Sequence, residues 1–302
     1  MIRIEDTYAE AFDSLVMRLL ITARDERQLS RAAGRSTSTP AIVIGRTEGG
    51  VERTLSKDET PDGRVGAIVQ FHGMIDPRRP LEESRLRFVR EVSYRIRQDI
   101  LCTPTTRVFN ALNTREEVDI MDWVGRCGDG YEWETKRYGC DMIHIPLMMP
   151  GFEIERYLGC VVGASGGNIW LFCEDEDTAL EAGERAIGAI QRVEGVITPF
   201  HICPAGSKPE TKYEWIGPTT NHIYCPELRG KIADSRVPEN IGSIPEIVID
   251  GINLEAVKKG MLSGIRSVQG IDGVFKISAG NYGGRLGKHK IFLKELVPEL
   301  VL

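Results

Sequence analysis

The chain has 302 residues, of which 41% are apolar and 27% charged, and its formal net charge is −6. Ordinary globular domains have such values, and this length allows two domains or one large domain of two lobes. The net negative charge argues against a dedicated nucleic-acid-binding protein, because neutralising phosphates needs a basic surface. No apolar run is long enough to span a membrane, and acidic residues stand where a signal peptide carries basic ones. We therefore expect a cytoplasmic protein without membrane contact.

The seven cysteines are odd in number and form no C-x-x-C pair, so they predict neither a disulfide framework nor a zinc knuckle. Most lie in apolar runs such as YLGCVVG (157–163), where cysteine acts as a small core residue. No histidine pair has metal-binding spacing, and we predict no metal. His201 and Cys203 are close enough in sequence for a base–thiolate pair, but such spacing is more often coincidental.

Strand and helix signals occur along the first half in a definite order. The long helix of this half carries Val89, Val92, Ile96 and Ile100 at helical spacing, so these side chains are expected on one buried face. The predicted elements are a strand at 14–23, a helix at 25–33, strands at 40–45 and 65–73, a helix at 81–100 and a strand at 105–112.

The same order returns in the second half. Its first helix presents Leu180, Ile187 and Ile190 on one face with an Asp or Thr as N-cap, and its second helix has Asn253 as N-cap. Val257, Met261, Ile265 and Val268 are aligned along that second helix. The predicted elements are a strand at 168–174, a helix at 177–193, strands at 195–200 and 244–252, a helix at 254–268 and strands at 273–280 and 289–296.

Both halves therefore have the order β-α-β-β-α-β, which is the split βαβ, ferredoxin-like order. We predict an α+β protein in which two ferredoxin-like lobes form one compact subunit. The pattern is interrupted by two prolines and a glycine in IPLMMPGFEIE (145–155). The predicted lobes are accordingly residues 1–147 and 148–302.

Two glycine-rich stretches, VVGASGGNIW (161–170) and SAGNYGGRLGK (278–288), raise the question of a nucleotide site. Neither contains G-x-G-x-x-G, and His289 stands where a phosphate loop requires Ser or Thr. Each stretch taken alone is more typical of a turn or bulge between strands. Each also includes an asparagine, Asn168 or Asn281, and this modestly favours a ligand lying close to the backbone.

Glu246 begins an alternating strand pattern in which Glu246, Val248 and Asp250 face one side and Ile247 and Ile249 the other. A carboxylate in such a strand is either a salt-bridged residue at a wet edge or a partly desolvated group. Desolvation raises the pKa of a carboxyl, which suits a general base near neutral pH. The spacing alone favours the salt-bridged edge residue.

The segment 78–97 holds seven arginines against three glutamates. Two interpretations fit this pattern: a solvated helix face with i,i+4 ion pairs, or a docking surface for an acidic partner. We favour the solvated face.

Taken together, several segments closely resemble the formylmethanofuran:tetrahydromethanopterin formyltransferase family over nearly the whole chain. The combination of EIVIDG with KISAGNYGGRLG is long and unusual, so the resemblance is specific. The segments are DTYAEAF (6–12), ETPDGR (59–64), LCTPTTRVFNAL (101–112), GASGGN (163–168), GVITPF (195–200), EIVIDGIN (246–253) and KISAGNYGGRLGKHKIFLKEL (276–296).

The resemblance implies two ferredoxin-like lobes in a homotetramer or homodimer with active sites at subunit interfaces. It implies transfer of a formyl group between the amine of methanofuran or methylofuran and N5 of tetrahydromethanopterin, both as substrates, without a prosthetic group. Glu246 is the implied catalytic acid/base, and backbone N–H groups at the glycine turns are candidate oxyanion donors. The substrate-binding candidates are Gly166, Gly167, Asn168, Ser207, Lys208, Asn221, Ser278, Gly280, Asn281, Gly283 and Gly284.

The chain departs from the family pattern at AGRSTSTPAIVIG (33–45) and at His201–Pro204, which bears on contacts with the furan carrier. Its modest charge and arginine-rich helix are similar to bacterial, methylotroph-type members. There the implied partners are the other subunits of a formyltransferase/hydrolase complex. The alternative function is a non-catalytic carrier-binding or scaffolding subunit, which would bind partners without transferring formyl groups.

Overall fold

The computed structural model describes residues 2–38, 47–149 and 151–300. The chain divides into two compact units, Ser14–Gly163 (the N-terminal unit) and the residues up to Asp13 together with those from Ala164 onward (the C-terminal unit). The chain passes from one to the other within β2 (Tyr8–Ala23) and within β11 (Val161–Cys173). The predicted division at 147/148 rests on the prolines and the glycine that interrupt the sequence pattern, whereas these units are defined by packing. The residues up to Asp13 pack with the C-terminal unit.

The N-terminal unit is built on a β-α-β-β-α-β core. β2 pairs antiparallel with β4 and β5, and β4 pairs antiparallel with β3, so the strand order is β5-β2-β4-β3, as in a ferredoxin-like fold. The core elements are β2, α1 (Glu26–Thr37), β3 (Thr47–Leu55), β4 (Val65–Met74), α3 (Leu81–Arg95) and β5 (Arg107–Asn110). Shorter strands follow: β6 (Glu117–Asp119), β7 (Trp133–Arg137), β8 (Cys140–Ile145), β9 (Phe152–Glu155) and β10 (Tyr157–Gly159).

One predicted element of this unit lies outside the described residues, and another differs in part from the structure. The strand predicted at 40–45 falls outside the described residues, and the strand that pairs with β4 begins at Thr47. The helix predicted over 81–100 ends as an α-helix at Arg95 and continues as a π-helical turn over Ile96–Ile100. Its predicted buried face, Val89, Val92, Ile96 and Ile100, is confirmed.

Ion pairs surround the arginine-rich surface of α3. Arg79 Nη1 lies 2.9 Å from Glu83, Arg87 lies 3.8 Å from the same carboxylate, and Arg85 Nη2 lies 2.7 Å from Glu116. These contacts fit the favoured interpretation of a solvated helix face.

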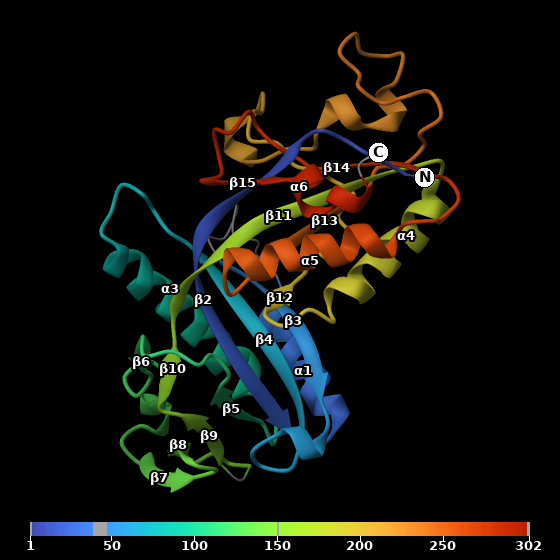
Figure 1. Ribbon diagram of the computed structural model, residues 1–302. Helices are drawn as coiled ribbons and strands as arrows, with labels where there is room; N and C mark the ends of the chain where they lie inside the picture. The colour runs from blue at the N-terminus through green and yellow to red at the C-terminus, as the bar shows by residue number, and fades with distance from the viewer. Residues whose placement is uncertain (1, 39–46, 150, 301–302) are drawn as a thin grey trace. The chain divides into compact units, whose positions relative to one another are not determined.

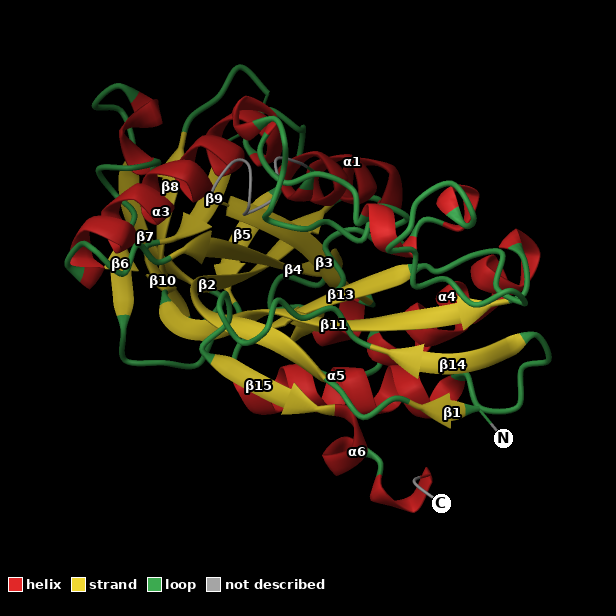
Figure 2. Cartoon of the chain, turned by 90° about the horizontal axis from the view of Figure 1, so that it is seen from above, coloured by secondary structure: helices red, strands yellow, loops and turns green. Residues whose placement is uncertain are grey.

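The C-terminal unit repeats the same topology. β11 pairs antiparallel with β13 and β14, and β12 pairs with β13, which gives the order β14-β11-β13-β12. The α+β class predicted from the sequence is thus confirmed. The elements of this unit are β1 (Arg3–Ile4), β11, α4 (Glu176–Ile190), β12 (Val196–Ile197), β13 (Glu246–Gly251), α5 (Leu254–Ser267), β14 (Val274–Ser278), β15 (His289–Phe292) and α6 (Leu293–Leu296) (Figures 1 and 2).

The second long helix of this unit begins at the predicted cap, Asn253, whereas the first begins at Glu176, one residue before the predicted start, and is capped by Asp175. Asp175 accepts a hydrogen bond from the Thr178 N–H at 2.8 Å, and Asn253 accepts one from the Ala256 N–H at 2.8 Å. Ile187 and Ile190 of α4 are buried as predicted, but Leu180 is exposed and that part of the prediction is wrong. The turns of α4 that face the core carry small residues instead, which lets the helix pack closely.

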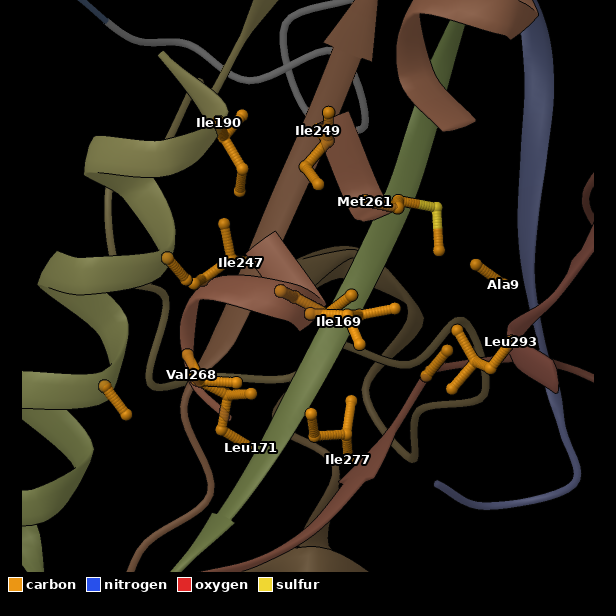
Figure 3. Close-up of a cluster of buried hydrophobic side chains, with 14 of the residues drawn as sticks. Ala9, Ile169, Leu171, Ile190, Ile247, Ile249, Met261, Val268, Ile277 and Leu293 are labelled. Carbon is orange, nitrogen blue, oxygen red and sulfur yellow. The ribbon is translucent and has the colours of Figure 1, made fainter. Parts of the chain in front are cut away.

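The apolar core of the C-terminal unit lies between the strands and the two helices. Figure 3 shows Ile169, Ile247, Ile249 and Ile277 from the strands and Met261 of α5 as members of this one cluster of buried side chains. Ile247 and Ile249 are fully buried in this core, so the alternation of β13 turns Glu246 to the other face. The sheet thus fixes the direction in which the Glu246 side chain points.

Candidate active site

Glu246 is a buried carboxylic acid at the start of β13. The residue is 8% exposed, and its backbone makes two hydrogen bonds with Cys203, of 2.8 and 2.9 Å. Burial raises the pKa of the Glu246 carboxyl above its ordinary value, and hydrogen bonds from Trp170 and Cys203 oppose the rise only in part. Such a carboxyl is suited to exchange protons closer to neutral pH than an exposed glutamate.

Trp170 is the direct cross-strand neighbour of Glu246 in the β11–β13 pair. Its Nε1–H donates to Oε1 of Glu246 at 2.9 Å, and the Tyr224 ring meets the indole edge-on at 4.9 Å between centroids. Among the described residues, the side-chain partners of Glu246 are Trp170 and Cys203 rather than a basic group. The salt-bridged edge residue that the spacing favoured is therefore a wrong interpretation.

Two cavities near this carboxyl share Trp170, Asn221 and Tyr224 in their linings, and one of them is lined by Glu246 itself. The cavity of about 490 Å³ is lined by charged and polar groups, among them Lys208, Arg236, Ser278, Asn281 and Arg285. The cavity of about 610 Å³ contains Glu246 and is lined largely by apolar side chains, among them Ile202, Pro204, Leu228 and Pro245. We call them the polar cavity and the Glu246 cavity. The two cavities are thus neighbours through Trp170, Asn221 and Tyr224, and the carboxylic acid lies in the second of them.

The predicted binding residues separate into two groups in the structure. Lys208, Asn221, Ser278, Asn281 and Gly283 line the polar cavity, and Asn221 also lines the Glu246 cavity. The Asn281 side chain reaches the segment between β1 and β2, because its amide donates to Thr7 Oγ1 at 2.8 Å. Five of the predicted residues are thus brought together at one place.

The first glycine cluster serves packing within the C-terminal unit. Gly166, with φ of +87°, lies where the β11–β13 register shifts, and its N–H donates to Asp250 at 2.9 Å. A Cβ on Gly167 would lie 2.3 Å from Cγ1 of Val257 in α5. Neither glycine lines the two cavities described above.

The second glycine cluster wraps around a carboxylate of the chain itself. Four backbone N–H groups, those of Tyr282, Gly284, Leu286 and Gly287, donate to Glu10. Burial alone would raise the pKa of Glu10, but these four donors together lower it. The sequence predicts that the backbone of this glycine cluster lies close to an external ligand. In the structure this backbone lies close to the Glu10 carboxylate of the same chain.

These hydrogen bonds bear on the expected oxyanion donors. The Gly284 N–H is taken by Glu10, and the Gly280 N–H donates to Oδ1 of Asn168 at 2.6 Å. The Gly283 N–H points to Oδ1 of Asn281 at 3.4 Å. Because these three N–H groups already have internal acceptors, they are less available to a substrate oxyanion than the sequence suggests.

Ser207 contributes through its backbone, because its carbonyl accepts a hydrogen bond from the Tyr282 hydroxyl. Sequence reasoning missed Glu10, Trp170, Tyr224 and Tyr282. Tyr282 stands inside a motif that was singled out, but Trp170 is recognisable only once the register of β11 against β13 is known.

The base–thiolate pair is not formed. Burial raises the pKa of the Cys203 thiol, which disfavours a thiolate, and the exposed His201 ring lies 3.8 Å from Glu184 instead. Over the described residues, no cluster of three or more His, Cys, Asp or Glu side chains is arranged to hold a metal ion. No helix in that part of the chain is long and apolar enough to cross a membrane.

Fold and site together define a two-lobed α+β protein with a buried carboxylic acid in one of two neighbouring cavities. Residues 1–147 match the family model described as formylmethanofuran-tetrahydromethanopterin formyltransferase, and residues 150–296 match that of its proximal lobe. The chain therefore belongs to the formylmethanofuran–tetrahydromethanopterin formyltransferase family, which confirms the resemblance seen in the sequence.

Relatives match over almost the full length. The chain is 52% identical over 298 residues to a formylmethanofuran–tetrahydromethanopterin formyltransferase-like protein of Archaeoglobus fulgidus, covering 97% of this chain and 96% of the relative. It is 39% identical over 300 residues to the formyltransferase of Methanosarcina barkeri, covering 98% of each.

Two solved structures share the fold. The Methanosarcina barkeri formyltransferase superposes with a TM-score of 0.89 at 38% identity, covering 98% of both chains. A chain of the formyltransferase/hydrolase complex from Methylorubrum extorquens, solved with methylofuran, superposes with a TM-score of 0.88 at 30% identity, covering 98% of this chain and 97% of the other. The fold thus occurs in both an archaeal enzyme and a bacterial complex.

Proposed function

We propose that this protein transfers a formyl group between the amine of a methanofuran-type carrier and N5 of tetrahydromethanopterin, with Glu246 as general acid/base. The observation that carries the proposal is the buried carboxyl of Glu246, with its raised pKa, in a cavity of this family's fold. Buried carboxyls without a basic partner are costly to keep, and they concentrate at functional sites.

The reaction needs one proton to move in each direction. The attacking secondary amine forms a bond to the formamide carbon while the carbonyl electron pair moves to oxygen. The Glu246 carboxylate takes the proton of the attacking nitrogen and then delivers it to the leaving amine as the old C–N bond breaks. Proton count and charge balance over the cycle, and such acid–base assistance is worth about 10² to 10⁴ in rate.

The paired cavities support a direct transfer between two bound carriers. Holding both reactants at one carboxyl converts a bimolecular encounter into a positioned reaction, which supplies a further large part of the rate enhancement. The shared wall of Trp170, Asn221 and Tyr224 is where such reactants would approach each other.

Asn221 is the group that we propose as oxyanion donor. It is buried and lines both cavities, and its amide supplies two N–H donors. In this proposal the Asn221 side-chain amide donates a hydrogen bond to the developing oxyanion, in place of the glycine N–H groups that are bonded to internal acceptors.

The second candidate is a carrier-binding or scaffolding subunit without transfer activity. It is kept because four relatives at 50–54% identity are named formyltransferase-like, whereas those named formyltransferase are 39–40% identical. Homo-oligomeric assembly and association with hydrolase-complex subunits remain proposals for either candidate.

Spectrophotometric measurement of formyl transfer from formylmethanofuran to tetrahydromethanopterin by the purified chain separates the two candidates. We expect transfer by the wild type, a loss of at least about a hundredfold in Glu246→Gln, and normal transfer in the matched exposed control Glu239→Gln. Absence of transfer by a folded wild type that still binds a carrier would favour the scaffolding subunit.

A further inference from the structure

Trp170 is in contact with the proposed acid/base and is held on several sides. The indole is buried, with 5% of its surface exposed, and its single N–H donates to Oε1 of Glu246 at 2.9 Å. The Tyr224 ring packs edge-on against it. A buried carboxyl without such a donor would turn between several orientations in its cavity.

Gly280 lies against the same indole. A Cβ added at Gly280 would lie 2.7 Å from Cζ2 and 3.1 Å from Cε2 of Trp170, so any side chain there displaces the ring. Asn168 holds Gly280 in place, because Oδ1 accepts the Gly280 N–H at 2.6 Å and Nδ2 lies 3.3 Å from the Gly280 carbonyl. The chain of contacts runs from Asn168 through Gly280 and Trp170 to Glu246.

We propose that Trp170 is a positioning residue for Glu246 and that Gly280 is required because only a bare backbone leaves the indole in place. This inference rests on the proposed function. The indole N–H holds Oε1 and so sets the orientation of the carboxyl that exchanges the proton with the carriers. One residue of each glycine-rich stretch, Asn168 and Gly280, thereby acts on the carboxyl through the indole.

The indole N–H also affects proton affinity. A donor hydrogen bond stabilises the ionised carboxylate, so it opposes the rise in pKa that burial causes at Glu246. Removing the donor while keeping an aromatic ring raises the pKa further, and the carboxylate form becomes scarcer at neutral pH.

Trp170→Phe tests the role of the donor. We expect the midpoint on the acid side of the kcat–pH profile to move up by about one pH unit, because a hydrogen bond to a charged group is worth about one such step. Turnover at pH values below the new midpoint falls and recovers as the pH is raised. Trp215→Phe, at an exposed tryptophan of the same unit, is the matched control and leaves the midpoint unchanged.

Gly280→Ala tests the packing requirement with the indole still present. The added methyl displaces the ring, and we expect the same upward movement of the midpoint at unchanged secondary structure. Gly188→Ala, in a helix where an added Cβ meets nothing within 4 Å, is the control for the substitution itself.

A readout without turnover uses the infrared carboxyl band of Glu246, isolated as the difference between wild type and Glu246→Gln in substrate-free protein. We expect the band to titrate at higher pH in Trp170→Phe. Unmoved titration in both Trp170→Phe and Gly280→Ala, with Glu246→Gln still inactive, overturns the positioning role alone. Full activity of Glu246→Gln overturns the proposed function itself.

Discussion

At the scale of residues, the buried carboxyl of Glu246 that we propose for catalysis also lowers the free energy of unfolding when it is ionised. Because its pKa is raised in the folded protein, the folded state binds the proton more tightly than the unfolded chain does. Its contribution is therefore present at low pH and is lost as the pH rises from the unfolded pKa through the folded one.

This sign gives a prediction for Glu246→Gln beyond activity. A neutral amide of the same shape avoids burying a charge, so we expect Tm at neutral pH to equal or exceed that of the wild type while turnover collapses. Scanning calorimetry at several pH values measures this. A variant clearly less stable than the wild type at neutral pH would show that the carboxylate stabilises the fold.

The contribution of Glu10 to stability depends on pH in the opposite direction. Four backbone donors lower its pKa, so its contribution is present above the unfolded pKa and is lost as the pH falls through the folded one. In Glu10→Gln, an NH₂ group replaces one acceptor oxygen and faces backbone N–H groups of the 282–287 loop. We expect a loss of about 2–4 kcal/mol in the free energy of unfolding by urea at neutral pH.

The control for Glu10→Gln is the exposed Glu239→Gln, which should leave the unfolding midpoint in place. The deficit of Glu10→Gln should shrink at low pH, where the wild-type carboxylate also becomes protonated. A deficit that is constant with pH would indicate that the loop depends on the shape of the side chain and not on its charge.

Asn221→Ala tests the proposed oxyanion donor. Loss of one such donor costs about 10² to 10³ in kcat, and we expect a smaller effect on KM because the interaction forms mainly in the transition state. Steady-state kinetics with each carrier varied in turn measure the two effects separately. A change confined to KM would make Asn221 a binding residue only.

At the scale of elements, the glycines of β11 set how closely α5 packs. The Cβ of Gly167→Ala would meet Val257 at 2.3 Å, and relieving this contact moves the helix or forces a strained rotamer. We expect a loss of about 1–3 kcal/mol in the free energy of unfolding, with KM for both carriers unchanged in the folded fraction. An altered KM without a loss of stability would indicate that Gly167 is a substrate-binding residue, as its sequence motif predicts.

The elements also show which features of the site local sequence patterns can predict. Alternation over 246–250 predicted the outward turn of Glu246 because period 2 is a local property of a strand. Its tryptophan partner lies 76 residues away, and the acceptor of the 282–287 loop more than 270 residues away. Such partners follow from register and topology, which no local pattern encodes. The prediction that Leu180 shares the buried face of α4 was wrong for a related reason. Helical spacing alone does not decide which residues of an apolar stripe the strands cover.

At the scale of the whole molecule, the C-terminal unit is completed by the first thirteen residues. β1 pairs with β14, the start of β2 pairs with β15, and Glu10 holds the glycine loop. A fragment of residues 148–302 should therefore leave the 280–288 loop open to proteolysis. Adding a peptide of residues 1–13 should restore protection, and a peptide with Glu10→Gln should restore less. Equal protection without any peptide would contradict this dependence.

The central claim concerns one carboxyl, and single-turnover formyl transfer as a function of pH tests it most directly. For the wild type we predict a rate that rises with pH to a plateau, with a midpoint above the ordinary glutamate pKa. For Glu246→Gln we predict loss of that step and a plateau lower by about 10² or more. A Glu246→Gln profile that overlays the wild type in both height and midpoint would contradict the account.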